Sequence, residues 1–475
     1  MIALLLAGLS IANAQATDRV WLIGGGYDPE NSQVQIEQNV LWARSVLHSV
    51  PGERELLILF NDGSDPAPDV VQWQKPAEDA AHLQPLARVY GEFHWNGETL
   101  RSHRIPAVDG PATRAAVLEL LQQEIPALRA GEQGLLVYAG HGSPADTGSQ
   151  LDLWEGGALD QADLRELLAR QPPATTLRLV FTQCFAGGFQ DALLPEENAA
   201  ADKDDTAAPR RCAFYAASRD QPAEGCTAGL EVSEYRGYAN YFFAALAGQS
   251  RDGVALLADP DRNGDGRTDP YEAHLYTLRA ARSTDLPRSS SEQYLLDWEP
   301  WYLPLLPVSA RNDNPYPDIA SALADDLGLP DASRPTVHAH RKTVQQQIRR
   351  LLYRQEQARS RAESVMESLQ AGLEQRWPQA RYPHTLAYQR FLRDELNAAQ
   401  EFIQAHPQYP ELVQDQDTYW TLDNAIVELQ RRSAQLDRIE LLQHLARLRD
   451  AFLARADASK QSLYRRLLRC EQAPL

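Results

Sequence analysis

The chain has 475 residues, with 46 Lys and Arg against 65 Asp and Glu and a formal net charge of −19 at pH 7. This length fits about two to four domains, and the acidic balance without a long basic run argues against nucleic-acid binding. The four cysteines are too few for a disulfide scaffold.

The N-terminal segment MIALLLAGLSIANAQATD is apolar and carries Ala-x-Ala at residues 12–14 and 14–16. It has the length of a signal peptide and is too short to cross a bilayer. We therefore expect residues 1–16 to be removed on export, which predicts a periplasmic or secreted protein. Because no Lys or Arg precedes the apolar stretch, a buried strand or helix is the alternative. No later segment is apolar enough to span a membrane.

Strand and helix signals then alternate along the chain. Candidate strands are DRVWLIGGG, RELLILFNDG, EQGLLVYAGHGSP and LRLVFTQC, and candidate helices are QNVLWARSVLHSV, GPATRAAVLELLQQEIPAL and LDQADLRELLARQ. This order predicts an α/β fold with a mostly parallel sheet and helices on both faces. The glycines at 24–26 lack the G-x-G-x-x-G spacing, so they predict a tight turn and not a nucleotide site.

Two residues with catalytic potential follow apolar strands and have glycines close by. His141 lies between Gly140 and Gly142, and Cys184 precedes the glycines at 187–188. Ligands of open α/β sheets bind beyond the carboxyl ends of the strands. If the two strands are neighbours, the imidazole and the thiol face each other as a base and its nucleophile. Backbone N–H groups near Gly142 and at Cys184 would then point at a developing oxyanion.

These residues resemble the caspase-like cysteine peptidases, which include caspases, metacaspases, gingipains and legumains. The resemblance covers about residues 18–300 and depends on GPATRAAVLELL, LLVYAGHGSP and LRLVFTQCFAGGF. It implies a caspase-like fold with His141 as the base, Cys184 as the nucleophile, and the N–H groups of Gly142 and Cys184 as oxyanion donors. The segment CAFYAASRDQPAEGC resembles the strand and loop of the specificity pocket, which implies substrate contacts from Ser218 and Asp220.

Two features near the nucleophile leave the specificity and the activation open. Thr182 stands where the family often has a specificity-setting Asp, Glu or Gln, so the preferred charge of the substrate side chain is undetermined. The polar segment at residues 193–211 has no periodicity, and we expect a mobile surface loop. In caspases this place holds the linker that is cut during activation. A solvated loop without that role is the alternative.

The segment DRNGDGRTDPYE, residues 261–272, matches the twelve-residue pattern of an EF-hand calcium loop. The ligand positions are filled by Asp261, Asn263, Asp265, the backbone carbonyl of Arg267, Asp269 and Glu272. Gly266 at the sixth position permits the sharp turn. No second EF-hand is visible, so we expect an isolated structural or regulatory Ca²⁺ site. An acidic surface turn is the alternative.

The last third of the chain has a different pattern. Residues 301–335 are rich in Pro and aromatic residues and predict an irregular connector over the first domain. Over residues 336–475, apolar positions recur every three or four residues in two long stripes. They predict an α-helical domain, a hairpin or small bundle of two long helices with a shorter one between. Its polar faces are typical of solvated helices, and partner binding or self-association is the alternative.

The cysteines are Cys184, Cys212, Cys226 and Cys470. In an exported protein Cys212 and Cys226 could pair, and two free thiols are the alternative. Together these observations predict an exported cysteine endopeptidase acting on peptides or proteins, whose chemistry needs no cofactor. A non-catalytic caspase-fold binding protein and a legumain-type transpeptidase, which uses the same dyad, are the alternatives.

Overall fold

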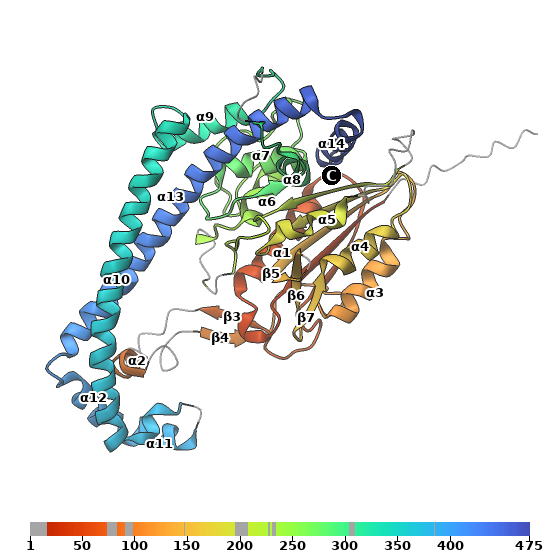
Figure 1. Cartoon of the computed structure of the whole chain (residues 1–475). Coiled ribbons are helices and arrows are strands. Elements are labelled where there is room, and N and C mark those ends of the chain that lie inside the picture. The colour runs from red at the N-terminus through yellow and green to blue at the C-terminus, as the bar shows by residue number, and fades with distance from the viewer. Residues whose placement is uncertain are drawn as a thin grey trace, which may run out of the picture.

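The computed structural model describes residues 17–73, 83–90, 98–146, 148–194, 208–226, 229, 234–303, 309–383 and 385–475. It shows an α/β body from which a long helical arm extends (Figure 1). We call residues 334–455 the arm, and the other described residues the body. The predicted signal peptide at 1–16 and residues 195–207 of the predicted loop lie outside the described residues.

The body contains an eight-stranded sheet. Its main run has the order β10 (Arg288–Ser289), β9 (Arg210–Tyr215), β8 (Thr176–Phe181), β5 (Gln133–Ala145), β1 (Asp18–Gly25) and β2 (Arg54–Phe60). Neighbours in this run pair in parallel, except that β10 is antiparallel to β9. The other two strands of this sheet are antiparallel, since β6 (Gly148–Leu153) pairs with β5 and with β7 (Gly157–Asp160). A separate two-stranded antiparallel sheet consists of β3 (Val70–Trp73) and β4 (Glu98–Arg101). The predicted α/β fold with a mostly parallel sheet is confirmed.

Side-chain alternation along β1 explains why helices cover both faces of the sheet. Val20 and Leu22 pack against α1 (Val34–Ser49), α6 (Tyr238–Ala247) and α7 (Pro270–Ala280). Trp21 and Ile23 point the other way and pack against α3 (Arg114–Glu124) and α4 (Gln161–Ala169). A parallel strand that is buried on both faces must be apolar throughout, which is why these strands stand out in the sequence.

Short helical segments complete the body. They are η1 (Pro29–Asn31), η4 (Ala186–Phe189), α5 (Gln190–Leu193), α8 (Ser290–Trp298) and α9 (Tyr316–Asp326). The helix α9 lies inside the segment 301–335, for which the sequence predicts irregular chain. Tyr316, Ile319 and Leu323 of α9 are buried in a core shared with α7 and the arm, so tertiary packing stabilises a helix in a segment whose composition favours none.

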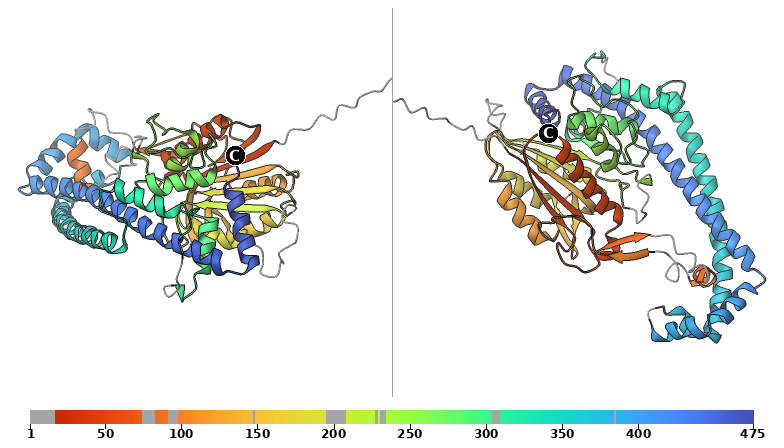
Figure 2. Two further views of the ribbon diagram at one scale, coloured as in Figure 1. Left: turned by 90° about the horizontal axis from the view of Figure 1, so that it is seen from above. Right: turned by 180° about the vertical axis from the view of Figure 1, so that it is seen from behind.

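The arm consists of two long helices, as the sequence predicts. α10 (Arg334–Arg376) and α13 (Tyr409–Arg455) lie side by side along its length (Figure 1). The turn η7 (Pro378–Arg381) and the helices α11 (Leu386–Asp394) and α12 (Leu396–Gln404) form the distal end (Figure 2). The two long helices share a buried apolar seam, for example Ala362 and Leu369 of α10 with Leu412 of α13 near the distal end.

The distal end of the arm is not free of the body. The helix α2 (Gln84–Tyr90) belongs to the body by sequence, but its Leu86 and Val89 are buried in the distal core of the arm. Arg88 Nη2 donates to Asp417 Oδ1 at 3.0 Å, and Gln370 Nε2 donates to the Val89 carbonyl at 2.7 Å. The arm therefore contacts the body at both of its ends.

The helix α14 (Ala458–Glu471) returns the chain from the arm to the sheet. Cys470 at its end forms a disulfide with Cys212 of β9, with 5.8 Å between the Cα atoms. A pair of Cys212 with Cys226, which the sequence leaves open, is therefore wrong, and Cys226 is free. The fully buried Arg178 of β8 donates to the Cys470 carbonyl at 2.9 Å. Residues 456–475 thus belong to the body and not to the helical domain predicted for 336–475.

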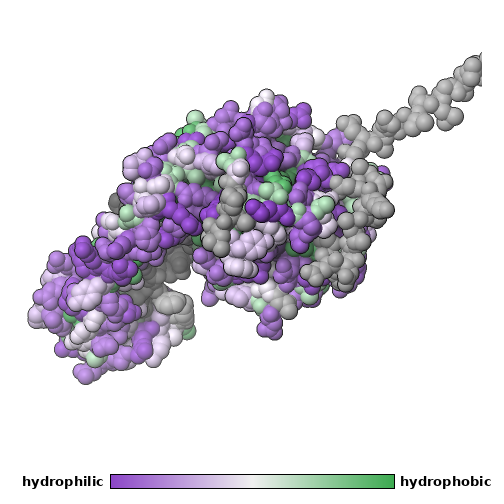
Figure 3. Space-filling model, turned by 45° about the horizontal axis from the view of Figure 1, so that its top comes forward, coloured by the Kyte–Doolittle hydropathy of each residue, from purple (hydrophilic) through white to green (hydrophobic). Residues whose placement is uncertain are grey.

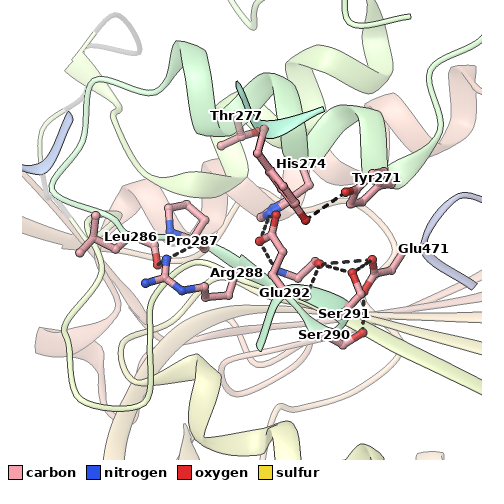
Figure 4. Close-up of polar contacts among 12 residues, drawn as sticks. Tyr271, His274, Thr277, Leu286, Pro287, Arg288, Ser290, Ser291, Glu292 and Glu471 are labelled. Carbon is pink, nitrogen blue, oxygen red and sulfur yellow. Dashed lines mark hydrogen bonds and ion pairs between the residues drawn. The ribbon is translucent and has the colours of Figure 1, made fainter. Parts of the chain in front are cut away.

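A buried polar cluster anchors α14 (Figure 4). The Glu471 carboxylate accepts hydrogen bonds from Ser290 Oγ at 2.7 Å and from Ser291 Oγ at 2.6 Å. Beside it, His274 Nε2 lies 2.9 Å from Glu292 Oε2, and both side chains are fully buried. Buried polar groups need such partners, so the cluster determines where α14 lies on the body.

The visible surface is mostly hydrophilic. On the face shown in Figure 3, hydrophilic side chains dominate over both the body and the arm. Within the part of the chain that the structure describes, no helix combines the length and apolar character that a membrane crossing requires.

Candidate active site

The strands that lead to His141 and Cys184 are neighbours in the sheet. β5 and β8 pair in parallel, and the last pair of their ladder joins Tyr138 to Phe181. His141 lies three residues after Tyr138, and Cys184 lies three residues after Phe181. Because parallel strands end at the same edge of a sheet, both residues lie at its carboxyl edge. This is the adjacency on which the predicted dyad depends.

β5 does not end at His141, which corrects one sequence expectation. The strand continues to Ala145 and pairs there with β6, so that His141 lies opposite Asp152. Between β5 and β8 the chain therefore forms a β6–β7 hairpin as well as the predicted helix α4. The hairpin was missed because its strands are short, and because β5 exchanges a parallel partner for an antiparallel one without a break in the sequence pattern.

Gly142 lies directly against the segment that carries the thiol. A Cβ atom at this position would lie 2.4 Å from Gln183 Cγ and 2.7 Å from the Cys184 carbonyl oxygen. Any side chain would therefore push β5 away from the turn after β8. Glycine permits this close approach, and it places the Gly142 backbone beside Cys184, as an oxyanion donor requires.

The hydrogen bonds of His141 determine which of its ring nitrogens can act as a base. Nε2 lies 2.9 Å from the Asn31 carbonyl oxygen and 2.9 Å from Gln33 Oε1. A carbonyl oxygen can only accept, so Nε2 carries the hydrogen and the neutral ring has its lone pair on Nδ1. Nδ1 forms no hydrogen bond within the described part of the chain. The ring of Tyr27 packs edge-on against the imidazole at 5.7 Å between centroids.

The Cys184 thiol contacts a backbone segment and not the imidazole. The Ala223 N–H donates to Sγ at 3.2 Å, and the thiol donates to the Ala223 carbonyl at 3.6 Å. Ala223 belongs to the loop after β9, whose Gln221 carbonyl also accepts from the Phe185 N–H at 2.9 Å. The thiol is therefore half-buried beneath this loop.

Burial makes both members of the predicted dyad neutral at pH 7. It raises the pKa of the Cys184 thiol, against hydrogen bonds from the N–H groups of Ala223 and of Cys184 itself. It also lowers the pKa of the His141 imidazole, against the Asn31 carbonyl and the charge of Asp152. If the imidazole takes up the thiol proton, two neutral groups favour general-base activation over a resting ion pair.

Asp152 is an acidic residue of the site that sequence reasoning missed. Its carboxylate accepts from Ser143 Oγ at 2.5 Å and from Gln150 Nε2 at 2.9 Å. Its negative charge partly offsets the lowering of the His141 pKa by burial and adds to the raising of the Cys184 pKa, so it would stabilise an imidazolium at His141. The alternating run SQLDL is the sequence signal that identifies the strand carrying it.

The three residues predicted to contact substrate occupy different environments. Ser218 Oγ donates to Asp220 Oδ1 at 2.7 Å, within the loop after β9. The Gly187 N–H donates to the Ala217 carbonyl at 3.0 Å, so this loop runs beside the segment after Cys184. Thr182 is only 9 % exposed, and its hydroxyl donates to the Tyr138 carbonyl at 3.0 Å. Its side chain therefore extends the β5–β8 contact and does not join the surface loop.

The predicted calcium loop closes on itself through its own side chains. Asp261 Oδ1 accepts from the Gly264 N–H at 2.7 Å, and Oδ2 accepts from the Gly266 N–H at 2.8 Å. Asn263 Oδ1 accepts from the Asp265 N–H at 2.8 Å. Asp265 Oδ1 then accepts from the Arg267 N–H at 2.9 Å. These bonds tie the side-chain oxygens of three predicted ligands to backbone N–H groups of the same loop and so fix its turn.

The end of the loop is also the start of α7. Asp269 caps the helix by accepting from the Glu272 N–H at 2.8 Å, and Glu272 Oε2 accepts in return from the Asp269 N–H at 3.1 Å. Glu272 Oε1 accepts from the Asn263 N–H at 3.0 Å, so it reaches back across the loop. Burial, together with the charge of Glu272, raises the pKa of Asp269 to about 7. Bound Ca²⁺ would offset this repulsion.

A second possible metal centre has no motif in the sequence. Asp62, Asp69 and His103 each offer one ligand atom, and these atoms lie within 4.8 Å of one another. His103 Nε2 donates to the Gly63 carbonyl at 2.7 Å, and Nδ1 accepts from the Ile105 N–H at 3.2 Å, so a cation bound at Nδ1 would have to displace that hydrogen bond. Burial and the charge of Asp69 raise the pKa of Asp62 to about 6. This set could hold a divalent cation, whereas the carboxylates of 261–272 are not gathered within the same mutual distance in the described residues.

The chain matches no family model and no curated protein. The crystal structure of protein GSU0716 from Geobacter sulfurreducens aligns with 57 % of this chain and 92 % of its own, at 12 % sequence identity and a TM-score of 0.33. A likeness this low carries no argument about function, which must be argued from the geometry of the site.

Proposed function

We propose that this protein is an exported, caspase-like cysteine endopeptidase that hydrolyses peptide bonds through His141 and Cys184. The observation that carries the proposal is the parallel pairing of β5 with β8, because it brings a base and a nucleophile to one edge of the sheet. The contact of the Gly142 backbone with Cys184 supports it, since an oxyanion donor is needed at that position.

The proposed reaction begins with proton transfer from the Cys184 sulfur to Nδ1 of His141. The sulfur then bonds to the substrate carbonyl carbon, and the carbonyl π electrons move onto the oxygen, which the N–H groups of Gly142 and Cys184 would bind. Collapse breaks the C–N bond, and His141 gives its proton to the leaving amine. Water hydrolyses the thioester and regenerates the thiol. Asp152 stabilises the transient imidazolium.

The disulfide supports the proposed export. Cys212 and Cys470 are joined across 258 residues, and such structural disulfides persist in oxidising compartments such as the periplasm and the extracellular space. We therefore propose a periplasmic or secreted location.

We also propose a Ca²⁺ ion in the loop at 261–272, with a structural or regulatory role. The helix α7, about 16 Å long, leads from this loop toward Thr284 and Asp285. The Thr284 N–H donates to Glu224 Oε2 at 3.2 Å, and Asp285 Oδ1 accepts from the Glu224 N–H at 2.6 Å. Glu224 adjoins Ala223, which contacts the Cys184 sulfur. Order at the calcium loop can thus affect the thiol through this chain of contacts.

A peptide-library cleavage assay of purified protein, with and without Ca²⁺, tests the proposed reaction. Cys184→Ala should abolish cleavage, and His141→Ala should lower it by about 10² to 10⁴. A thiol-reactive peptide electrophile should label Cys184 but not Cys226, whose pKa is raised to about 12 by burial. Full cleavage by Cys184→Ala would refute the proposal.

The same assay separates the alternatives. A legumain-type transpeptidase would transfer the acyl group to an added amine, so products joined to that amine would appear beside the hydrolysed peptides. A non-catalytic binding protein would show neither cleavage nor selective labelling of Cys184.

A further inference from the structure

The arm holds the loop that contacts the thiol. Besides its two bonds to the segment after α7, Glu224 accepts from Arg431 Nε at 3.0 Å. Arg431 belongs to α13 of the arm and lies 207 residues further along the chain. The side chains of Glu224 and Arg431 are 21 % and 20 % exposed, so the ion pair is largely shielded from water.

A second arginine determines where α13 lies on the body. Arg438 follows Arg431 by seven residues, about two helical turns, and therefore lies on the same face of α13. Its fully buried guanidinium donates to the carbonyls of Thr277, Leu278 and Ala281 at the end of α7. The position of Arg431 is thus set by a buried contact and not by the Glu224 pair alone.

The two contacts of Ala223 with the sulfur respond differently to ionisation. The bond from the thiol to the Ala223 carbonyl needs the thiol hydrogen and disappears in the thiolate. The bond from the Ala223 N–H, at 3.2 Å, persists and strengthens because its acceptor becomes charged. An N–H held in this place therefore favours the thiolate, which is the form that attacks a carbonyl carbon.

We propose that Glu224 and Arg431 are positioning residues for Cys184, and that their ion pair holds the Ala223 N–H against the sulfur. The arm would then contribute directly to the reactivity of a thiol in the body. The proposal rests on the proposed function only in taking Cys184 as the nucleophile. Without the pair, residues 221–226 keep their bonds to Asp285 and Phe185, but they hold the Ala223 N–H less closely against the sulfur. The sulfur then has a weaker hydrogen-bond donor and becomes more accessible.

The test is the pH profile of Cys184 alkylation by iodoacetamide in the full-length protein, followed by mass spectrometry of the Cys184 peptide. Glu224→Gln and Arg431→Gln should each raise the half-maximal pH by about one unit, which is about tenfold less thiolate at neutral pH. Both should also raise the limiting rate at high pH. Arg431→Lys keeps a charged donor and should recover part of the shift. Arg432→Gln is the matched control, because the neighbouring Arg432 donates to the Leu327 carbonyl instead.

An unchanged half-maximal pH in folded Glu224→Gln and Arg431→Gln would overturn the proposal, and so would an equal shift in Arg432→Gln. If Arg431→Gln fails to fold, the half-maximal pH of Cys184 alkylation in Glu224→Gln and Arg431→Lys tests the proposal. The alkylation assay needs no turnover, so the two proposals fail separately. If the profile shifts in the variants but the wild type cleaves no peptide, the proposed peptidase activity is wrong and the positioning role stands. If the wild type cleaves peptides but the profile does not shift, the positioning role is wrong and the peptidase activity stands.

Discussion

The body and the arm are stabilised in different ways. In the body, strands are buried on both faces and polar groups find partners far along the chain, as when Arg178 donates to the Cys470 carbonyl 292 residues away. In the arm, many charged side chains pair within one turn, such as Arg359 with Glu356. Exposed pairs of this kind contribute little, so the arm depends on its apolar seam. The difference teaches that the arm follows local helix rules, whereas the site in the body requires long-range contacts.

Loss of the disulfide should lower the stability of the protein more than any other change considered below. For a loop of 258 residues, the chain-entropy model gives about 5.6 kcal/mol of stabilisation. Cys470→Ser should lower the free energy of unfolding by about this amount, and reductant should lower the melting temperature of the wild type but not that of Cys470→Ser. Cys226→Ser is the control, because Cys226 is free and the variant should keep the response to reductant. If reductant does not change the melting curve of the wild type, the disulfide does not stabilise the body.

Matched core truncations should separate the two regions. Leu179 in β8 and Leu369 in α10 are both fully buried, and replacing either by Ala should cost about 2 to 5 kcal/mol. Leu179→Ala should lower hydrogen-exchange protection throughout the body, because that core is shared by many segments. Leu369→Ala should lower it first in the distal arm. The same pattern of lost protection in both variants would show that body and arm unfold as one unit.

Removal of calcium should weaken the body more than the arm. A cation bound only to the folded state adds about 2.7 kcal/mol at a hundredfold excess over its dissociation constant. Chelation should therefore lower the melting temperature, and Glu272→Gln should blunt that response while it keeps an oxygen for the cap on α7. Glu166→Gln, at an exposed position on α4, is the control. Calorimetry without a heat of binding, together with an unchanged melting curve, would leave the loop as an acidic turn.

The pH dependence of stability should come from the body. Burial raises the pKa of Glu471 from 4.5 to about 8, against the serine donors around it. The folded state therefore binds this proton more tightly than the unfolded state. This contribution is complete below about pH 4.5 and is lost as the pH rises through 8.

Glu471→Gln should flatten the dependence of the melting temperature on pH between about pH 5 and pH 8. The corresponding change in the free energy of unfolding is on the order of 2 kcal/mol. Part of the slope should remain, because burial also raises the pKa of Asp269 and of Asp285 to about 7. Glu440→Gln in the arm is the matched control. An equal flattening in that variant would contradict the assignment to Glu471.

The smallest effect is expected at the surface of the arm. Arg341 of α10 donates to Asp437 at 3.0 Å and to Glu440 at 2.7 Å, both on α13. Its side chain is 27 % exposed, so Arg341→Gln should cost less than about 1 kcal/mol. Urea unfolding measures this cost. A loss comparable to that of Leu369→Ala would mean that ion pairs, and not the seam, hold the two helices together.

The sequence by itself was sufficient where neighbouring residues share one kind of environment. Doubly buried strands such as β1 and β8 are continuous apolar runs, and the apolar spacing in α10 and α13 follows the helical period. The same reasoning predicted the places of His141 and Cys184, because glycines and polar residues interrupt an apolar run where a strand leaves the core. The EF-hand pattern of 261–272 was likewise visible, because its spacing is local.

Only the tertiary structure decided which segments meet. It turned β5 toward β6, which placed Asp152 opposite His141. It also joined Cys212 to Cys470 and brought Arg431 of the arm to Glu224. The physical reason is that periodicity reports whether a residue is buried, whereas the free energy of a disulfide, an ion pair or a strand pair depends on the geometry between segments that lie far apart in the chain. No local pattern encodes that geometry.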